Sequence, residues 1–412
     1  MVSLVTGMVI GIILVGYLTM AGSNQRAVAR SEAWNATMPV IEAGIEEAMA
    51  HIHRNFPTNA ESNGWIGSGT NVLKWRWMGD GIYLVYISDT DTNKPVIQSY
   101  GYMRLPLNNT YISRSVRAQT VLTSVVTKVV FADESIKLNG FSMSTDSYDS
   151  RDTNYSSATG QYDPAKNKSG GDVGTNSEEA GAFNAGNSQI YGTVSTGAGA
   201  TVSVGANGSI GSDAWHDAGS TGIEPGWSND DANVPMPAVQ PPFMGGAFMP
   251  TGGFVGLNFY NYILGSANYQ LSSFGGKVLV TGNAVLLVTD RVQFSGQDSI
   301  EIMPGASLKL YVAARDAAIG GNGVINSSEL STSFIYYGLP SNQSLSISGN
   351  GALAGLVYAP NADVQLNGGG NVYGAVMCKS ASVNGTFNFH FDEALKDPKF
   401  MGRYTIVSWD EL

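Results

Sequence analysis

Cysteine is almost absent from this chain: Cys378 is the only one among 412 residues. A single thiol excludes an intramolecular disulfide framework and any zinc or iron–sulfur site built from several cysteines. Four histidines leave little room for a His-rich metal centre. Charged residues make up only 13% of the chain, about half the roughly 25% of an average soluble domain. The formal net charge of −11 argues against nucleic acid as a partner.

Catalytic motifs are absent as well. The sequence holds no G-x-S-x-G, P-loop, H-E-x-x-H or EF-hand pattern, so we expect no enzyme activity. The densest polar group is His390, Asp392 and Glu393. On a strand, His390 and Asp392 would share one face. We interpret the group as the capped end of a β-structure with a hydrogen-bonded histidine.

A long uncharged run opens the chain. Residues 2–21 carry no charge, and a helix of that length crosses the roughly 30 Å hydrocarbon core of a bilayer. A basic segment of the kind that begins a secretory signal peptide is missing. We therefore expect Met1 to be the end of an already processed chain, or the run to be an anchor inserted without a leader.

The helical pattern continues past this run as a heptad-like stripe with spacings of three and four. We predict one helix over residues 1–56, kinked near Pro39. Its contacts with neighbouring copies are expected in the uncharged run and along the stripe. The run offers Val5, Val9, Ile12, Ile13 and Leu14, and the stripe is formed by Ala27, Ser31, Trp34, Met38, Ile41, Ile45, Ala48 and Ile52.

Strand patterns follow the helix. Residues 82–87, 95–103 and 111–130 are rich in β-branched and aromatic side chains and are separated by turn-forming clusters. We predict a small antiparallel sheet over residues 57–132, which covers the helix stripe in an α+β module.

Residues 133–400 become repetitive and rich in Gly and Asn. Gly351, Gly355 and Val357 each recur nineteen residues later, and short apolar runs recur every seven or eight residues from Val278 to Leu308. Such periods predict a right-handed-type parallel β-helix, because short strands must stack to bury their apolar faces. A β-sandwich is the alternative. Insertions are expected at 146–176 and 212–251, and a strand or tail at 401–412.

Two kinds of minor site are expected on the body. Asp146, Asp149 and Asp152 lie at i, i+3 and i+6 in a polar loop and could hold Ca²⁺; a solvated acidic loop is the alternative. Apart from this Ca²⁺, we expect no cofactor. Asn154, Asn167 and Asn207 stand in Asn-x-Ser/Thr sequons and are glycosylation candidates.

Two segments resemble a known family. The uncharged helix that continues into residues 38–52 (MPVIEAGIEEAMAHI) resembles the start of PilX-type type IV pilus assembly proteins, and residues 355–395 resemble the Gly-rich β-helical domain attached to such pilin-like starts. The resemblance implies a pilin-type helix, assembly by pilus machinery after cleavage by a prepilin peptidase, and no catalysis. Ordinary pilins have a glutamate at the fifth mature position, which pairs with a neighbour's terminal amine. Here that position is Val5, which questions the major-pilin assembly mechanism.

The sequence leaves three functions open. The first is a structural subunit of an extracellular type IV pilus-like filament, a homo-oligomer held by its helices and resident in the inner membrane before assembly. The second is a membrane-anchored β-helical adhesin or polysaccharide-binding or -degrading protein that does not polymerise. The third, a cytoplasmic scaffold like the bactofilins, is disfavoured by the uncharged run and the low charge.

Overall fold

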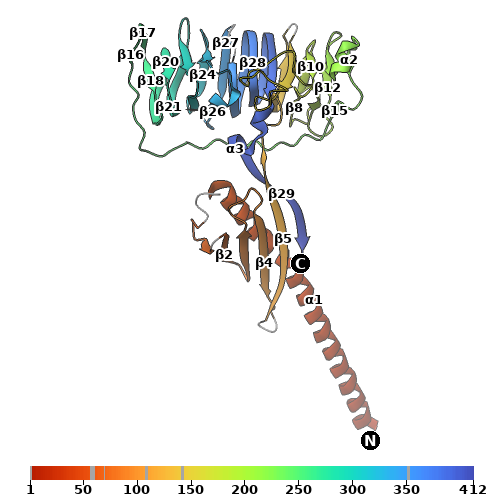
Figure 1. Cartoon of the computed structure of the whole chain (residues 1–412). Helices are drawn as coiled ribbons and strands as arrows, with labels where there is room; N and C mark the ends of the chain where they lie inside the picture. Colours follow the sequence, from red (N-terminus) through yellow and green to blue (C-terminus); the bar gives the residue numbers. More distant parts are fainter. Residues whose placement is uncertain (1, 56–60, 69, 107–109, 141–142, 350–352) are drawn as a thin grey trace. The chain divides into compact units, whose positions relative to one another are not determined.

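The computed structural model describes residues 2–55, 61–68, 70–106, 110–140, 143–349 and 353–412. The chain divides into two compact units (Figure 1): residues 1–123 with 402–412, and residues 124–401. We call the second unit the body. One long N-terminal helix is thus followed by a chain that is mostly β.

The first unit packs one helix on one sheet. Helix α1 (Val2–Asn55) passes through Pro39 without interruption. The sheet runs in the order β1-β2-β3-β4-β5-β29, antiparallel from β1 to β5. Its strands are β1 (Ile66–Ser68), β2 (Asn71–Met78), β3 (Gly81–Ser88), β4 (Val96–Arg104), β5 (Tyr111–Ser124) and β29 (Gly402–Glu411). The expected strand over residues 111–130 is two strands, because β5 ends at Ser124 and β6 begins at Val130.

Small residues let the helix lie close to the sheet. A Cβ atom on Gly101 of β4 would stand 2.7 Å from the Ile41 side chain and 2.8 Å from the Thr37 carbonyl oxygen. The Ser99 hydroxyl donates to the Ile41 carbonyl at 3.0 Å. This buries Ile41, Ile45 and Ile52 of α1 among the inward side chains of β3 and β4. Helix α1 and the sheet therefore share one apolar core.

Most strands of the body are short, and its described strands pair in parallel except for the antiparallel hairpin β16–β17. The first part of the chain supplies β6 (Val130–Leu138), β7 (Ser144–Tyr148), β8 (Val173–Thr175), β9 (Phe183–Gly186), β10 (Gln189–Tyr191), β11 (Val194–Ser195), β12 (Val202–Val204), β13 (Ser209–Gly211), α2 (Asp213–Asp217), β14 (Gly222–Ile223) and β15 (Ser228–Asn229). The second part supplies β16 (Gly253–Val255), β17 (Asn258–Tyr260), β18 (Tyr262–Leu264), β19 (Asn268–Phe274), β20 (Lys277–Val280), β21 (Asn283–Phe294), β22 (Ser299–Ile302), β23 (Ser307–Val312), β24 (Asp316–Ile319), β25 (Val324–Asn326), η1 (Ser331–Ser333), β26 (Phe334–Gly338), β27 (Ser344–Gly349), β28 (Leu353–Asp392), η2 (Glu393–Lys396) and α3 (Pro398–Met401).

The spacing of seven or eight residues corresponds to successive sides of one turn of chain, which we call a rung. Val278 pairs with Ile300, Val285 with Lys309, and Val292 with Ala317. These three pairs belong to three separate ladders, β20–β22, β21–β23 and β21–β24. A rung therefore contributes one short strand to each of three ladders, and the next rung repeats them.

The rungs do not stack in the order of the sequence. The chain enters in the middle: β6, β8, β11 and β15 stack towards one end. Residues 230–250 then run along the stack to the opposite end, where β16 begins (Figure 1). From there the rungs return, and the last part of β28 pairs with β6 and β7. The expected insertion at 212–251 thus includes α2, β14 and β15, and only its second part is irregular.

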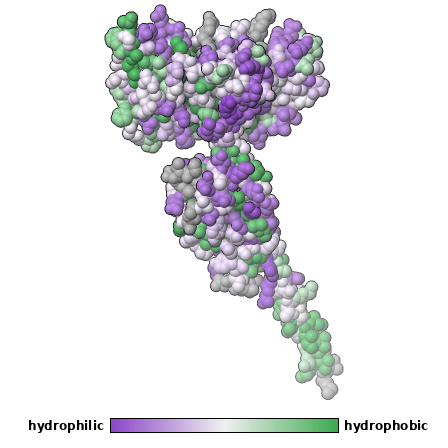
Figure 2. Space-filling model, viewed as in Figure 1, coloured by the Kyte–Doolittle hydropathy of each residue, from purple (hydrophilic) through white to green (hydrophobic). Residues whose placement is uncertain are grey.

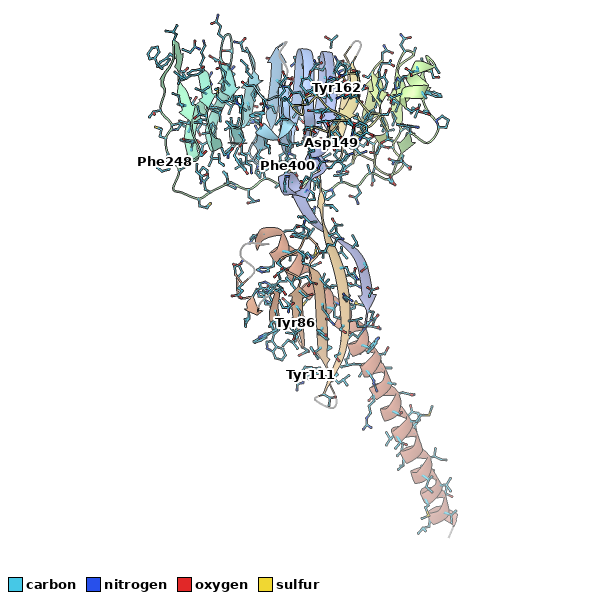
Figure 3. The ribbon with its side chains drawn as sticks, in the orientation of Figure 1. Tyr86, Tyr111, Asp149, Tyr162, Phe248 and Phe400 are labelled. Atoms are coloured by element: carbon cyan, nitrogen blue, oxygen red, sulfur yellow. The ribbon has the colours of Figure 1, made fainter. Side chains whose placement is uncertain are left out.

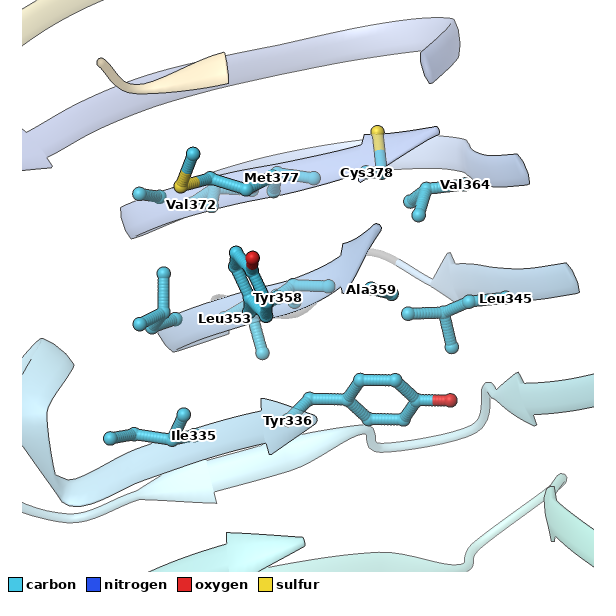
Figure 4. Close-up of a cluster of buried hydrophobic side chains, with 14 of the residues drawn as sticks. Ile335, Tyr336, Leu345, Leu353, Tyr358, Ala359, Val364, Val372, Met377 and Cys378 are labelled. Carbon is cyan, nitrogen blue, oxygen red and sulfur yellow. The ribbon is translucent and has the colours of Figure 1, made fainter. Parts of the chain in front are cut away.

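The core of the body lies inside this stack. Tyr336, Tyr358 and Leu345 are fully buried and come from neighbouring rungs (Figure 4). Tyr336 donates its hydroxyl proton to the Asn342 side chain. Tyr358 donates to the carbonyl of Pro237, which lies in the segment 230–250 that runs along the stack. These two buried tyrosine hydroxyls therefore each have a partner, which offsets the cost of burying them.

Candidate assembly helix and surface sites

The first half of α1 exposes its apolar side chains all around. Leu4 is 76% exposed, Ile13 64% and Leu18 59%, and Figure 2 shows the apolar colour gathered on this end of the helix. The helix is long and apolar enough to cross a membrane. The predicted contact residues Val5, Val9, Ile12 and Leu14 are exposed in the same way. This much apolar surface on a helix requires lipid or another apolar surface around it.

The second half of α1 packs against the sheet of the same chain. Ile41 and Ile45 are buried and Met38 packs against them. Trp34 is 43% exposed, and the Arg114 guanidinium lies 4.9 Å from its ring centre. Of the predicted contact residues, Ile41 and Ile45 therefore face this chain's sheet. Along the stripe, Ala27 and Ser31 are exposed.

An ionic contact fixes α1 on the sheet beside this core. The Glu47 carboxylate lies 2.7 Å from the Lys74 ammonium group, and the Tyr83 hydroxyl donates to the same carboxylate. Lys74 and Tyr83 belong to β2 and β3. The contact thus ties two strands to one turn of the helix.

His390 lies in a polar cluster beneath the loop 149–172. Its ring nitrogen Nδ1 is 2.6 Å from Asp146, and the Tyr162 ring lies against it, tilted by 31°, with ring centres 3.8 Å apart. Asp392 accepts hydrogen bonds from the backbone of Ser150 and Ala394. Both side chains leave the strand on one face, as expected. The cluster is not at an end of the stack, however, because the first rung of the body stacks on the last.

The three candidate calcium ligands point to different protein partners. Asp146 binds His390, Tyr162 and Asn167. Asp149, labelled in Figure 3, forms an ion pair with Arg151 at 2.9 Å. Asp152 accepts from the backbone of Asn154. Within the described ranges, no group of three His, Cys, Asp or Glu side chains could hold a metal ion. A calcium site here would require these partners to be released.

The glycosylation candidates differ in accessibility. Asn154 and Asn207 are exposed. Asn167 is half-buried, and its amide nitrogen donates to Asp146 at 3.1 Å. The amide nitrogen of Asn154 likewise donates to Asp152 at 2.9 Å, so accessibility alone distinguishes the three candidates, and glycosylation of each stays a prediction.

One apolar surface was not predicted. Met244, Phe248, Phe254, Leu257 and Phe259 are 51–99% exposed at the end of the stack that carries β16 and β17 (Figures 2 and 3). A sequence signal exists, because residues 232–276 hold no charged side chain. Because charged residues are scarce throughout the chain, this uncharged stretch does not stand out in the sequence.

Comparisons with known proteins do not identify the function of this chain. A family model described as a domain of unknown function, DUF7305, matches residues 276–398. No curated protein sequence matches the chain. The crystal structure of the competence-associated pilin ComZ from Thermus thermophilus is similar over 91% of this chain and 97% of its own, with 10% identity and a TM-score of 0.24. Values this low carry no inference about function.

Proposed function

We propose that the chain is a structural subunit of an extracellular type IV pilus-like filament. One observation carries the proposal: the apolar half of α1 is exposed, while the other half is held by its own sheet. Identical copies would bundle their exposed halves as the filament core. Burying a Val, Leu, Ile or Met side chain contributes roughly 1.5–3 kcal/mol, so the dozen such residues in the uncharged run would outweigh polar contacts between bodies.

The remaining parts take roles that follow from this arrangement. We infer that the body is a parallel β-helix displayed on the outside. It holds 23 Asp and Glu against 12 Lys and Arg, and so accounts for the whole net charge of −11. Like charges keep neighbouring bodies from adhering non-specifically. Before assembly the helix would sit in the inner membrane, where a prepilin peptidase and the pilus machinery would act on it. Catalysis has no part in the proposal.

Ile13→Asp tests the filament core. A charge at this position would lie unpaired among apolar helices, at a cost of several kcal/mol, so we expect no filaments in the sheared cell-surface fraction by negative-stain microscopy. Ile13→Leu conserves the apolar contact and is expected to assemble normally. Normal fibres from Ile13→Asp would exclude the proposed core.

The aspartate could also prevent membrane insertion, so a second measurement is needed. Cys378 is fully buried, which makes an introduced cysteine the only accessible thiol. Ile13→Cys is expected to give covalent dimers upon copper-catalysed air oxidation of the surface fraction, and Asn207→Cys on the body serves as the control. A monomeric Ile13→Cys protein that stays in the membrane would instead support the anchored, non-polymerising surface protein.

A further inference from the structure

The face of the six-stranded sheet opposite α1 is rich in aromatic side chains. Along β3 and β4 the inward residues are buried under the helix, and the alternate ones stay half-buried on the other face. Strand register aligns these residues in rows. Trp75, Leu84 and Tyr100 form one row; Trp77, Ile82 and Tyr102 form the next; Leu73, Tyr86, Gln98 and Arg117 form a third.

Two neighbouring hollows on this face share two lining residues, and we call them together the groove. The larger has a volume of about 620 Å³ and includes Leu73, Tyr86, Gln98 and Arg117 in its lining. The smaller has about 380 Å³ and is lined by Leu84, Tyr86, Gln98, Tyr100 and Tyr102. Tyr86, labelled in Figure 3, and Gln98 belong to both. A groove across β2 to β5 spans roughly 14 Å at the spacing of paired strands, which suits an extended chain better than a small molecule.

The rings of the groove are held in place. Tyr86 and Tyr100 meet edge to face with ring centres 6.0 Å apart. The Gln98 amide donates to the Tyr100 hydroxyl at 2.7 Å. Fixed rings lose little conformational entropy when a ligand stacks on them. Beyond the rings, the Tyr hydroxyls and the Asn71, Ser88 and Gln98 side chains offer hydrogen-bonding groups along the same groove.

Charge selects the ligand class. Arg117 is the only charged side chain among the described residues that line the two hollows. It is exposed and forms no ion pair within the described part of the chain. An unpaired guanidinium in a groove is suited to bind a carboxylate or sulfate in bidentate fashion.

The geometry points to a binding site for an acidic polysaccharide. Tyr86 and Tyr102 stack on the apolar faces of sugar rings, and Tyr100 supports Tyr86 edge to face. Gln98 and Asn71 bind hydroxyl groups, and Arg117 binds an acidic substituent. The site does not depend on the filament, because every lining residue belongs to one chain.

The test is isothermal titration calorimetry of the full-length chain in detergent micelles. Hexagalacturonate is the acidic probe and maltohexaose the neutral one. We expect hexagalacturonate to bind, more weakly as salt is raised, and at least tenfold more tightly than maltohexaose. Tyr86→Ala and Arg117→Gln are each expected to weaken binding at least tenfold. Arg76→Gln, on the opposite face of β2, is the matched control and should bind like the parent chain.

Three results would overturn the proposal. These are no binding of hexagalacturonate, equal binding of both probes, or a chain dimer in sedimentation that Tyr86→Ala dissolves, which would make a second copy the occupant. Circular dichroism melting shows whether Tyr86→Ala is folded. If it is not, Arg117→Gln still tests the site, because Arg117 is exposed and its substitution is not expected to disturb folding. The binding assay uses unassembled chains, so its outcome is separate from that of the filament experiments.

Discussion

At the scale of single residues, three consecutive rungs turn at Asn-Gly pairs. The pairs are 367–368, 384–385 and 139–140. The Asn384 amide donates to Asn367 at 3.1 Å, and the Asn139 amide donates to Asn384 at 3.4 Å. The glycines form a parallel column in which each lies against the carbonyl of the one before. The turn sequence thus satisfies side-chain polar groups and allows close rung contact at the same position.

Gly385→Ala tests this column. Gly385 has a φ of +138°, and a Cβ atom there would stand 1.8 Å from the Gly368 carbonyl oxygen. The rungs would have to separate, so we expect a loss of about 2–4 kcal/mol in the free energy of unfolding, measured by denaturant titration. Gly245→Ala, where nothing lies within 4 Å, should change it by less than about 0.5 kcal/mol. Equal effects of the two substitutions would contradict the tight stacking.

At the scale of elements, the loop 149–172 covers the polar cluster of His390 and is held by charged contacts. Hydrogen bonds from the Arg151 side chain hold the pKa of Asp149 below its usual value. Lys168 forms an ion pair with Glu393 that anchors the same loop to η2. A polar stretch of sequence is therefore an ordered cover, because its charges have partners on the last rung.

The substitution Asp149→Asn tests whether Asp149 stabilises the loop through its ion pair with Arg151 or by binding a calcium ion. Because the pKa of Asp149 is lower in the folded state than in the unfolded state, the ionised carboxylate stabilises the fold at pH values above its unfolded-state pKa. This contribution is lost as the pH falls through the folded-state pKa. Because the pair is partly exposed and screened, we expect Asp149→Asn to cost about 0.5 kcal/mol at pH 7 and progressively less as the pH falls below the unfolded-state pKa of the carboxylate. Thermal melts followed by circular dichroism measure both. A melting temperature of the parent chain that falls on adding a chelator would instead establish a bound cation.

At the scale of the whole molecule, the body has the properties of an independent folding unit. It has its own core, and its two ends meet where the Val125 amide donates to the Met401 carbonyl at 3.0 Å. The chain thus enters and leaves the stack at one place. The sheet of the first unit is completed separately by β29 after the chain has left the body.

Residues 124–401 alone are therefore expected to fold. The fragment should melt cooperatively and keep its near-ultraviolet circular dichroism, because every described strand of the body lies within residues 124–401. A chain cut at residue 375 removes the rung that pairs with β6 and β7, and it serves as the negative control. A fragment 124–401 without fixed tertiary signals would show that the first unit is required for folding.

The repeat illustrates the limit of sequence periodicity. Nineteen residues separate Gly355 from Gly374, and these two do face each other. Further along the same rungs the spacing is seventeen, from Gly368 to Gly385 and from Asn371 to Asn388. Rungs can differ in length at a turn without disturbing the ladders, so a single period predicts the repeat but not each pair.

Elements whose signals are local can be predicted from the sequence alone. The helix follows from the uncharged run and the stripe, strands β3 and β4 from alternation, and the short rung strands from Gly- and Asn-punctuated apolar runs, because backbone preference and side-chain periodicity act over a few residues. The sequence also placed His390 and Asp392 on one face. Four features can be read only from the folded chain. They are the order of the rungs, the pairing of the last rung with the first, the addition of β29 to the first sheet, and the partners of Asp146, Asp149 and Asp152. Each of these features depends on contacts between residues far apart in the chain. Local sequence patterns allow any apolar rung to stack on any other, and the fit of the complete core selects one stacking order.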